Sequence, residues 1–382
     1  MGEPYVPPQW VKGRTSRQAH VGLPDGTVEE EHGREGFSGP ASHLYRLHAP
    51  TGWTSVTGPL QPVALDAAKL DGSVLNGDGL NGDGHDLPVV LLENAELRVG
   101  WWRRPPDTDA GWFLRDADGD LLFLVHEGEG RLETEYGPLD YRAGDYLLVP
   151  RGTTHRFAPT ARTSLLTIES REGALRLPDR GLLGRHALFD PAMVTVPEPE
   201  PHDEAGEFEV RIVRGGAATA VVYPFHPLDV VGWKGDLAPL RLHTDDFRPV
   251  SSARYHLPPS AHTTFVADGF VVATFAPRPF EEDPDALKVP FFHRNTDYDE
   301  VIFYHRGDFF SRAGIEPGML TFHPAGIHHG PQPQAVERAA ARPPGGHADE
   351  VAVNVDARRP LTLTAAGESV RVAGYEESWR GA

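Results

Sequence analysis

The chain has 382 residues, no cysteine, and 55 acidic against 36 basic side chains, which gives a formal net charge of −19 at pH 7. This composition excludes disulfides, thiolate nucleophiles and iron–sulfur clusters. It also argues against nucleic acid or an anionic membrane surface as a partner, because each of these attracts a basic protein. The apolar runs, such as Leu121–Val125, are too short to span a bilayer, and the first residues lack a signal-peptide pattern. We therefore expect a cytoplasmic protein.

Its 41 glycines and 36 prolines lie between short apolar runs, which predicts a turn-rich β protein rather than a helical bundle. Residues 1–50 are polar and are expected to form an N-terminal arm that wraps a folded body. Residues 51–193 are predicted to form a first β-barrel, residues 194–208 a linker rich in proline and acidic residues, and residues 209–382 a second β-barrel. The 19 histidines are the leading candidates for metal or acid–base chemistry.

A short tandem repeat interrupts the first predicted barrel. Leu75–Gly79 and Leu80–Gly84 both read Leu-Asn-Gly-Asp-Gly, and Asn-Gly and Asp-Gly pairs are typical of tight turns. A calcium loop would use the same oxygen ligands, but this spacing lacks the terminal bidentate glutamate of such loops. We therefore predict a solvated surface loop.

A second repeat points to the fold. The pattern G-x5-P-x-G-x2-H occurs at Gly144–His155 and again at Gly318–His329. The first glycine turns into a strand, the Pro-x-Gly segment forms a tight turn, and the next strand can then direct its histidine inward. The pattern resembles the second motif of the cupin family of small β-barrels. The resemblance implies an all-β chain with two cupin-like, jelly-roll barrels.

The first cupin motif usually supplies further metal ligands. In the second barrel its place is taken by His293 and by Glu300, which is followed by six residues and a glycine. Together with His329 they offer two imidazoles and one carboxylate, a set that suits Fe(II) or Mn(II) and leaves positions open for a substrate and O2. Asp299 is a rival carboxylate, but adjacent strand residues face opposite ways. His155 has no such companions, so we expect the first barrel to be structural and metal-free.

His293 and His329 could instead be hydrogen-bonded core histidines, but the cupin spacing of the two histidines and Glu300 favours a metal site.

Longer segments resemble the homogentisate 1,2-dioxygenase family. Pro290–Asn295 resembles that family's aromatic-His-Arg-Asn ligand segment, His323–Pro331 its second ligand segment, and His256–Ser260 the segment whose first histidine is the acid–base residue. The resemblance covers about residues 110–380.

The resemblance implies an Fe(II)-dependent dioxygenase that cleaves the ring of homogentisate or a related 1,4-dihydroxybenzene, as in the catabolism of phenylalanine and tyrosine. The implied iron ligands are His293, Glu300 and His329, and the implied catalytic acid–base residue is His256. His323 and Phe309 are placed at the substrate. The expected partners are a small aromatic substrate, O2 and further copies of the chain in a trimer or hexamer.

The substrate stays open because the chain departs from the family at several places. The family's Gly-Phe-Gly-Asn-Glu and Tyr-Ala-Glu-Gln-Leu-Ser-Gly stretches are missing, and Phe309 stands where the family carries a substrate-binding tyrosine. The alternatives are a gentisate- or hydroquinone-type dioxygenase, a metal-dependent cupin isomerase that needs no O2, and a non-catalytic metal-binding bicupin. Arg294, Asn295 and Arg312 could supply the missing hydrogen-bond donor.

Overall fold

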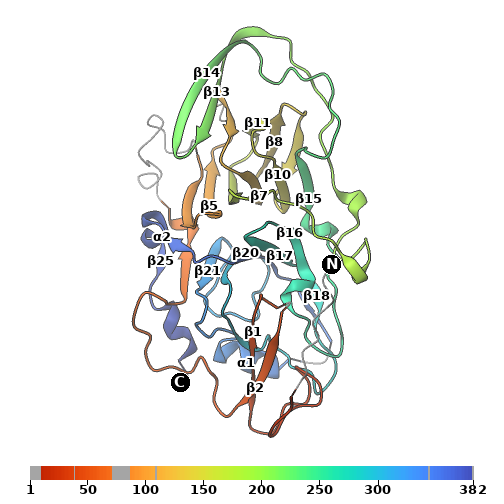
Figure 1. The fold of residues 1–382 in the computed structure, drawn as a ribbon, viewed down its shortest axis with the longest axis vertical. Coiled ribbons are helices and arrows are strands. Elements are labelled where there is room, and N and C mark those ends of the chain that lie inside the picture. The colour runs from red at the N-terminus through yellow and green to blue at the C-terminus, as the bar shows by residue number, and fades with distance from the viewer. Residues whose placement is uncertain (1–9, 38, 71–86, 108–109, 343–344, 381–382) are drawn as a thin grey trace.

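The computed structural model describes residues 10–37, 39–70, 87–107, 110–342 and 345–380 (Figure 1). Strands dominate this part of the chain, and its two α-helices are short: α1 (Pro333–Ala340) and α2 (Ala365–Ser369). The prediction of an all-β fold is therefore confirmed. The Leu-Asn-Gly-Asp-Gly repeat lies outside the described residues. Among the described residues, no helix is both long enough and apolar enough to cross a membrane.

Three large sheets lie one above another along the long axis of the molecule (Figure 1). The first contains β14 (Ala217–Phe225), β13 (Ala205–Arg214), β6 (Trp112–Asp116), β11 (Thr154–Pro159), β8 (Glu129–Thr134) and β9 (Leu139–Arg142). The second contains β15 (Leu240–His243), β10 (Asp145–Val149), β7 (Asp120–Glu127), β12 (Thr163–Ser170), β5 (Leu97–Arg104), β4 (Val89–Glu93) and β24 (Thr362–Leu363).

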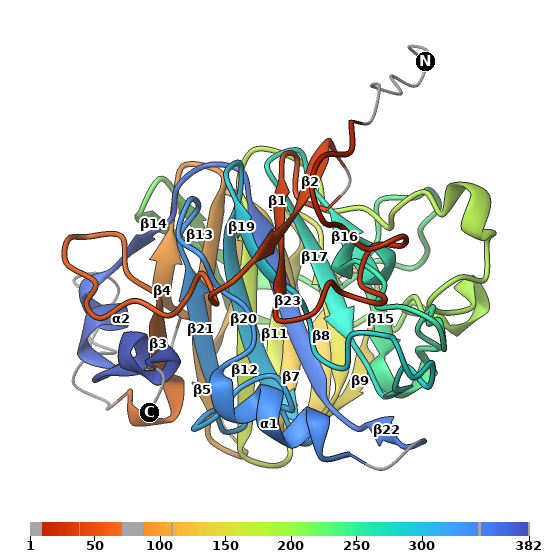
Figure 2. The ribbon, with the colours of Figure 1, turned by 90° about the horizontal axis from the view of Figure 1, so that it is seen from below.

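The third sheet contains β16 (Thr263–Val266), β17 (Phe270–Phe275), β23 (Val351–Ala357), β20 (Asp299–Arg306), β21 (Met319–His323), β3 (Val63–Asp66) and β25 (Arg371–Val372). Two smaller sheets complete the described fold: β19 (Phe292–Asn295), β1 (Val28–Gly33) and β2 (Ala41–Arg46), and the pair β18 (Arg278–Pro279) and β22 (His347–Ala348). Figure 2 shows β1, β19, β20 and β23 from below.

The second sheet is buried on both faces, which explains its continuous apolar sequence. On β7, Leu121, Phe123 and Val125 belong to one core cluster, which also includes residues of the first sheet. The alternate residues Leu122 and Leu124 belong to another cluster, shared with the third sheet. Successive strand residues point to opposite faces, so a strand in the middle of a stack needs apolar side chains at every position.

Strand pairing crosses the domain boundaries expected from the sequence at several places, of which three bear on the expected arm, linker and first barrel. β3, expected in the first barrel, pairs with β21 in the third sheet. β13, which begins within the expected linker, pairs with β6 in the first sheet. β1, in the expected arm, pairs in parallel with β19. Composition is a local property, whereas pairing joins segments far apart in sequence, so composition did not indicate these contacts. The division into two barrels stays a prediction.

Two contacts between segments far apart in the sequence position the candidate site. The parallel pairing of β1 with β19 fixes the strand on which His293 lies, with Glu31 opposite His293 in the register. At the C-terminal end of the described chain, the 3-10 helix at Tyr375–Trp379 packs beside His323. The indole N–H of Trp379 donates to the Gly330 carbonyl at 3.1 Å, so the tail holds the segment after His329 in place.

Candidate metal centre

Three predicted ligands converge at one buried point, which we call the centre. His293 lies on β19, Glu300 on β20, and His329 in the segment after β21. The Nε2 atom of His293 lies 3.7 Å from Glu300 Oε2, and the Nε2 atom of His329 lies 3.5 Å from Glu300 Oε1. The three residues are 9%, 6% and 2% exposed, respectively. One ligand atom from each lies within 4.8 Å of the others, as in a site that could hold a metal ion.

The backbone sets the orientation of the two imidazoles. His293 and His329 exchange two backbone hydrogen bonds, of 2.9 and 3.0 Å. Each Nδ1 atom lies near the carbonyl oxygen two residues earlier, at 3.3 Å from Phe291 and 3.2 Å from Ile327. A carbonyl only accepts, so each Nδ1 carries the proton and each Nε2 presents its lone pair. Both Nε2 atoms are buried without a hydrogen-bond partner, which is unusual unless an ion or ligand completes the site.

The charge of the site also suits a cation. Burial by itself would raise the pKa of Glu300, but His329, His293 and His323 around it hold that pKa well below its ordinary value. Burial and the neighbouring His329 lower the pKa of His293. The site therefore holds a carboxylate beside neutral imidazole, the protonation states that a divalent metal requires.

His323 lies behind the carboxylate. Its Nδ1 is 2.8 Å from Glu300 Oε1 and its Nε2 is 3.1 Å from the Tyr375 hydroxyl, while its ring stacks on that of His329 at 4.6 Å. Both ring nitrogens are thus engaged within the protein. The substrate-binding role of His323 stays a prediction, and these contacts favour a role in positioning Glu300.

The two neighbours that could have replaced a ligand point elsewhere. Asp299 accepts hydrogen bonds from the backbone N–H groups of Ala325 and Leu361, each at 2.7 Å. His328 lies 3.0 Å from a carboxylate oxygen of Glu30 on the other side of β1. Alternation along β20 therefore directs Asp299 away from the centre, toward which Glu300 points.

His256 lies outside the centre, and the ring of Phe291 lies between His256 and His293. The Nδ1 of His256 is 3.0 Å from Glu281 Oε1, and this side chain lines a pocket together with His262, Phe275 and Arg278. Its ring centroid is 6.2 Å from that of Phe291, which in turn is 5.7 Å from His293. The structure thus places the expected acid–base residue on the same side of the molecule as the centre, with Phe291 next to both.

Phe309 belongs to the apolar core. It is 4% exposed, its ring lies 4.8 Å from that of Tyr304, and it shares a core cluster with Ile302 and Ala352. Its predicted place at the substrate stays a prediction, and the contacts that the structure shows are with buried side chains of the third sheet.

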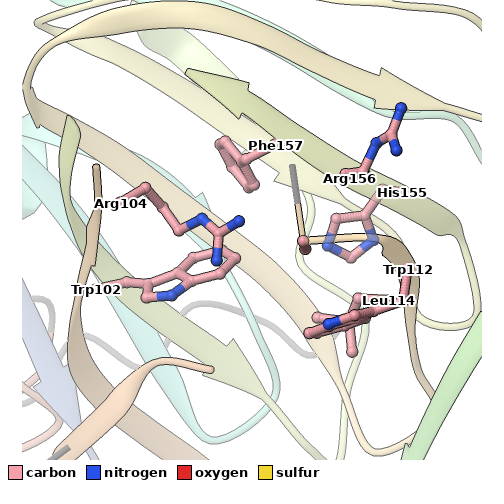
Figure 3. Close-up of a pocket in the computed structure, with 8 residues that line it drawn as sticks. Trp102, Arg104, Trp112, Leu114, His155, Arg156 and Phe157 are labelled. Carbon is pink, nitrogen blue, oxygen red and sulfur yellow. The ribbon is translucent and has the colours of Figure 1, made fainter. Parts of the chain in front are cut away.

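His155 lies in a small pocket within the first sheet region, lined by Trp102, Arg104, Trp112 and Phe157 (Figure 3). Burial lowers its pKa to about 4, and its Nδ1 lies 3.0 Å from the Thr153 carbonyl oxygen. In the described part of the chain, no group of potential ligands that could hold a metal includes His155. The metal-free role of this region stays a prediction.

Sequence reasoning did not identify Asp356, which lies opposite Glu300 in the pairing of β20 with β23. Burial, and then the charge of Glu300, raise its pKa to about 8, so at neutral pH it is largely protonated and adds little negative charge. The available signal was a pair of polar residues, Asn354 and Asp356, within an otherwise apolar, fully buried strand.

Comparison with known proteins gives three kinds of match. A family model described as "Homogentisate 1,2-dioxygenase N-terminal" matches residues 108–243. A protein of Saccharolobus solfataricus named "Putative dioxygenase" is 33% identical over 383 residues, which cover 96% of this chain and 98% of that protein. The homogentisate 1,2-dioxygenase of Bradyrhizobium diazoefficiens is 27% identical over 278 residues, 69% of this chain. This match spans 62% of the length of that enzyme. A solved cupin 2 conserved barrel domain protein from Leptotrichia buccalis aligns with a TM-score of 0.33 and 8% identity, over 78% of this chain and 96% of that one.

Proposed function

This chain belongs to the homogentisate 1,2-dioxygenase family, and from that premise we propose that it is an Fe(II)-dependent enzyme that uses O2 to cleave the ring of homogentisate or a related 1,4-dihydroxybenzene. One observation carries the proposal. Two buried imidazole nitrogens, on His293 and His329, lack any hydrogen-bond partner and face the carboxylate of Glu300. Two nitrogens and one carboxylate oxygen form the ligand set of non-haem Fe(II) oxygenases.

In this proposal His293, Glu300 and His329 hold the iron. When bound, the metal supplies open positions at which a ring hydroxyl and O2 can be brought together, and it acts as a Lewis acid. The chain's own contribution is to keep the ligands in place. The bonds from Nδ1 to backbone carbonyls fix both imidazole tautomers, and His323 fixes the Glu300 carboxylate. Such supporting contacts orient the ligands.

His256 is the proposed acid–base residue. The Glu281 carboxylate at its Nδ1 leaves Nε2 free to accept the proton of a substrate hydroxyl. Burial by itself would raise the pKa of Glu281, but His256 and its surroundings lower it, so the partner of His256 is a carboxylate anion. The side chains of the pair are each 14% exposed, which limits water around the transferred proton.

The pocket beside His256 supports the proposed substrate class. Its lining includes Arg278, Ser251 and Ser252, and the Arg278 guanidinium donates to Glu350 at 2.8 Å. A cation and two hydroxyls suit a small, polar, oxygen-bearing aromatic molecule. Gentisate and hydroquinone are the second candidates, because the sequence carries Phe309 where the resembled family has a substrate-binding tyrosine; the structure adds no support to this choice, since Phe309 lies in a core cluster.

The test is O2 uptake after anaerobic loading with Fe(II), with homogentisate, gentisate and hydroquinone in parallel. We expect uptake with at least one of them and a ring-opened product. Alanine in place of any ligand of the centre should abolish both iron binding and uptake. His328→Gln is the matched control, because His328 adjoins His329 but faces Glu30. Iron binding without O2 uptake for every substrate would instead point to an isomerase or a binding protein.

A further inference from the structure

A second group of histidines and carboxylates lies in the N-terminal arm. His20 precedes β1, Glu31 lies on β1, and His43 lies opposite Glu31 on β2. We propose that these three residues bind a divalent transition-metal ion of the Zn²⁺ type, which joins three segments of the arm next to the strand that carries His293. This site is separate from the centre and from the function proposed for it.

The spacing of the three side chains fits a metal. One ligand atom of each lies within 4.8 Å of the others, and His43 Nε2 is 3.9 Å from Glu31 Oε2. The corresponding distances in the centre are 3.5 and 3.7 Å. Tetrahedral ligands at about 2.0–2.2 Å from Zn²⁺ lie about 3.4 Å apart, so His43 and Glu31 lie close to the separation of two ligands of one ion.

Glu29 supports both imidazoles from behind. Its Oε2 lies 2.8 Å from His20 Nδ1, and its Oε1 lies 3.3 Å from His43 Nδ1. The backbone N–H of His20 also donates to Glu29, at 3.0 Å. The His20 contact is a hydrogen bond, while His43 Nδ1 and Glu29 Oε1 lie close together without forming one; both Nδ1 atoms thus lie beside one carboxylate, and the Nε2 atoms are left for an ion. Carboxylate–histidine–metal arrangements of this kind are typical of built metal sites.

Two carboxylates buried beside the histidines also favour a bound cation. Glu29 and Glu31 are 2% and 8% exposed. Among the described residues, no lysine or arginine forms an ion pair with either of them; Arg46 of the same hairpin pairs with Glu30, on the opposite face of β1. A divalent ion would balance two buried negative charges.

The site adjoins the centre without sharing a residue with it. The His20 ring stacks on Phe291 with 4.3 Å between centroids, and Phe291 lies 5.7 Å from His293. Glu31 is the register partner of His293 across the parallel β1–β19 pair. An ion at His20, Glu31 and His43 would therefore hold together the part of the arm that packs against the wall of the centre.

A third group, His202, Glu204 and His226, lacks these features and serves as the control. The His226 Nδ1 accepts the Leu228 N–H at 3.2 Å, rather than donating to a carboxylate. The side chain of Glu204 is 60% exposed. The rings of His202 and His226 stack at 4.2 Å. Exposed acidic groups and stacked rings occur without a metal, so no ion is assigned there.

The experiment counts bound ions on the full-length chain. Metal-free protein is titrated with Co²⁺ and Zn²⁺ in a calorimeter, bound metal is measured by mass spectrometry, and Co²⁺ absorption reports the coordination geometry. A His329→Ala chain, whose centre is disabled, should still bind one ion with a tetrahedral Co²⁺ spectrum. Adding His43→Ala or Glu31→Gln to that chain should remove the ion, and adding Glu29→Gln should weaken binding about 10–100-fold.

The matched control adds His202→Ala to the same chain and should leave its one ion in place. Circular dichroism and the melting temperature of each variant establish that it folds, and Glu31→Gln keeps the volume of the side chain should His43→Ala unfold. A His329→Ala chain that binds no ion would overturn the proposal, as would an ion that survives both His43→Ala and Glu31→Gln. Neither result bears on O2 uptake, so the proposed function and this site can fail separately.

Discussion

Replacing His323 tests whether this residue positions Glu300 or binds substrate. His323→Leu removes the 2.8 Å contact with Glu300 Oε1 and leaves the buried Tyr375 hydroxyl without the ring nitrogen 3.1 Å away. A hydrogen bond to a charged group contributes about 1.5–3 kcal/mol. Loss of a contact behind a metal ligand typically weakens metal binding about 10–100-fold, or about 1.4–2.7 kcal/mol.

The expected result is therefore an iron dissociation constant about 10–100-fold larger, with little change in KM once the enzyme is saturated with iron. Competition against a chelator of known affinity measures the first quantity, and O2 uptake at saturating Fe(II) measures the second. His323→Gln should recover part of the loss, because its amide can both donate and accept. His328→Gln, on the other face, should change neither quantity.

The opposite pattern would refute this reasoning. If His323→Leu raises KM at least tenfold while the iron dissociation constant stays within twofold of wild type, then His323 contacts the substrate. The hydrogen bonds of His323 to Glu300 and Tyr375 would then be broken when the substrate binds.

Three further predictions concern acid–base chemistry, the core and pH. His256→Ala should keep its iron and lose about 10²–10⁴-fold in turnover; an unchanged kcat would make His256 structural. Phe309→Tyr would place a hydroxyl in the apolar cluster with Tyr304, so we expect a loss of about 1–3 kcal/mol in unfolding free energy and no gain in homogentisate turnover. A clear gain in turnover would instead place Phe309 at the substrate. Burial lowers the pKa of His155 from 6.5 to about 4, so the folded state binds fewer protons than the unfolded state between these values. The stabilisation is then complete above pH 6.5 and is lost as the pH falls towards 4, by about 3 kcal/mol. Urea unfolding at pH 7 and pH 4 should show a smaller difference for His155→Leu than for the wild type.

The sequence by itself predicted the candidate ligands of the centre and determined the class of the fold. His293, Glu300 and His329 are separated by strand–turn–strand segments whose geometry is local, so their spacing carried the information needed to bring them together. Alternation along one strand was enough to separate Glu300 from Asp299. The frequent glycine and proline between short apolar runs predicted strands, and the unbroken run Leu121–Val125 belongs to a strand buried on both faces.

The tertiary structure alone decided which distant segments surround those ligands. The pairing of β1 with β19 brings Glu31 opposite His293, the pairing of β20 with β23 brings Asp356 opposite Glu300, and the C-terminal tail brings Tyr375 to His323. None of these contacts has a signature in sequence spacing. Each depends on which strand faces fit together across long loops, and that choice is made by the packing of the whole chain rather than by any local pattern.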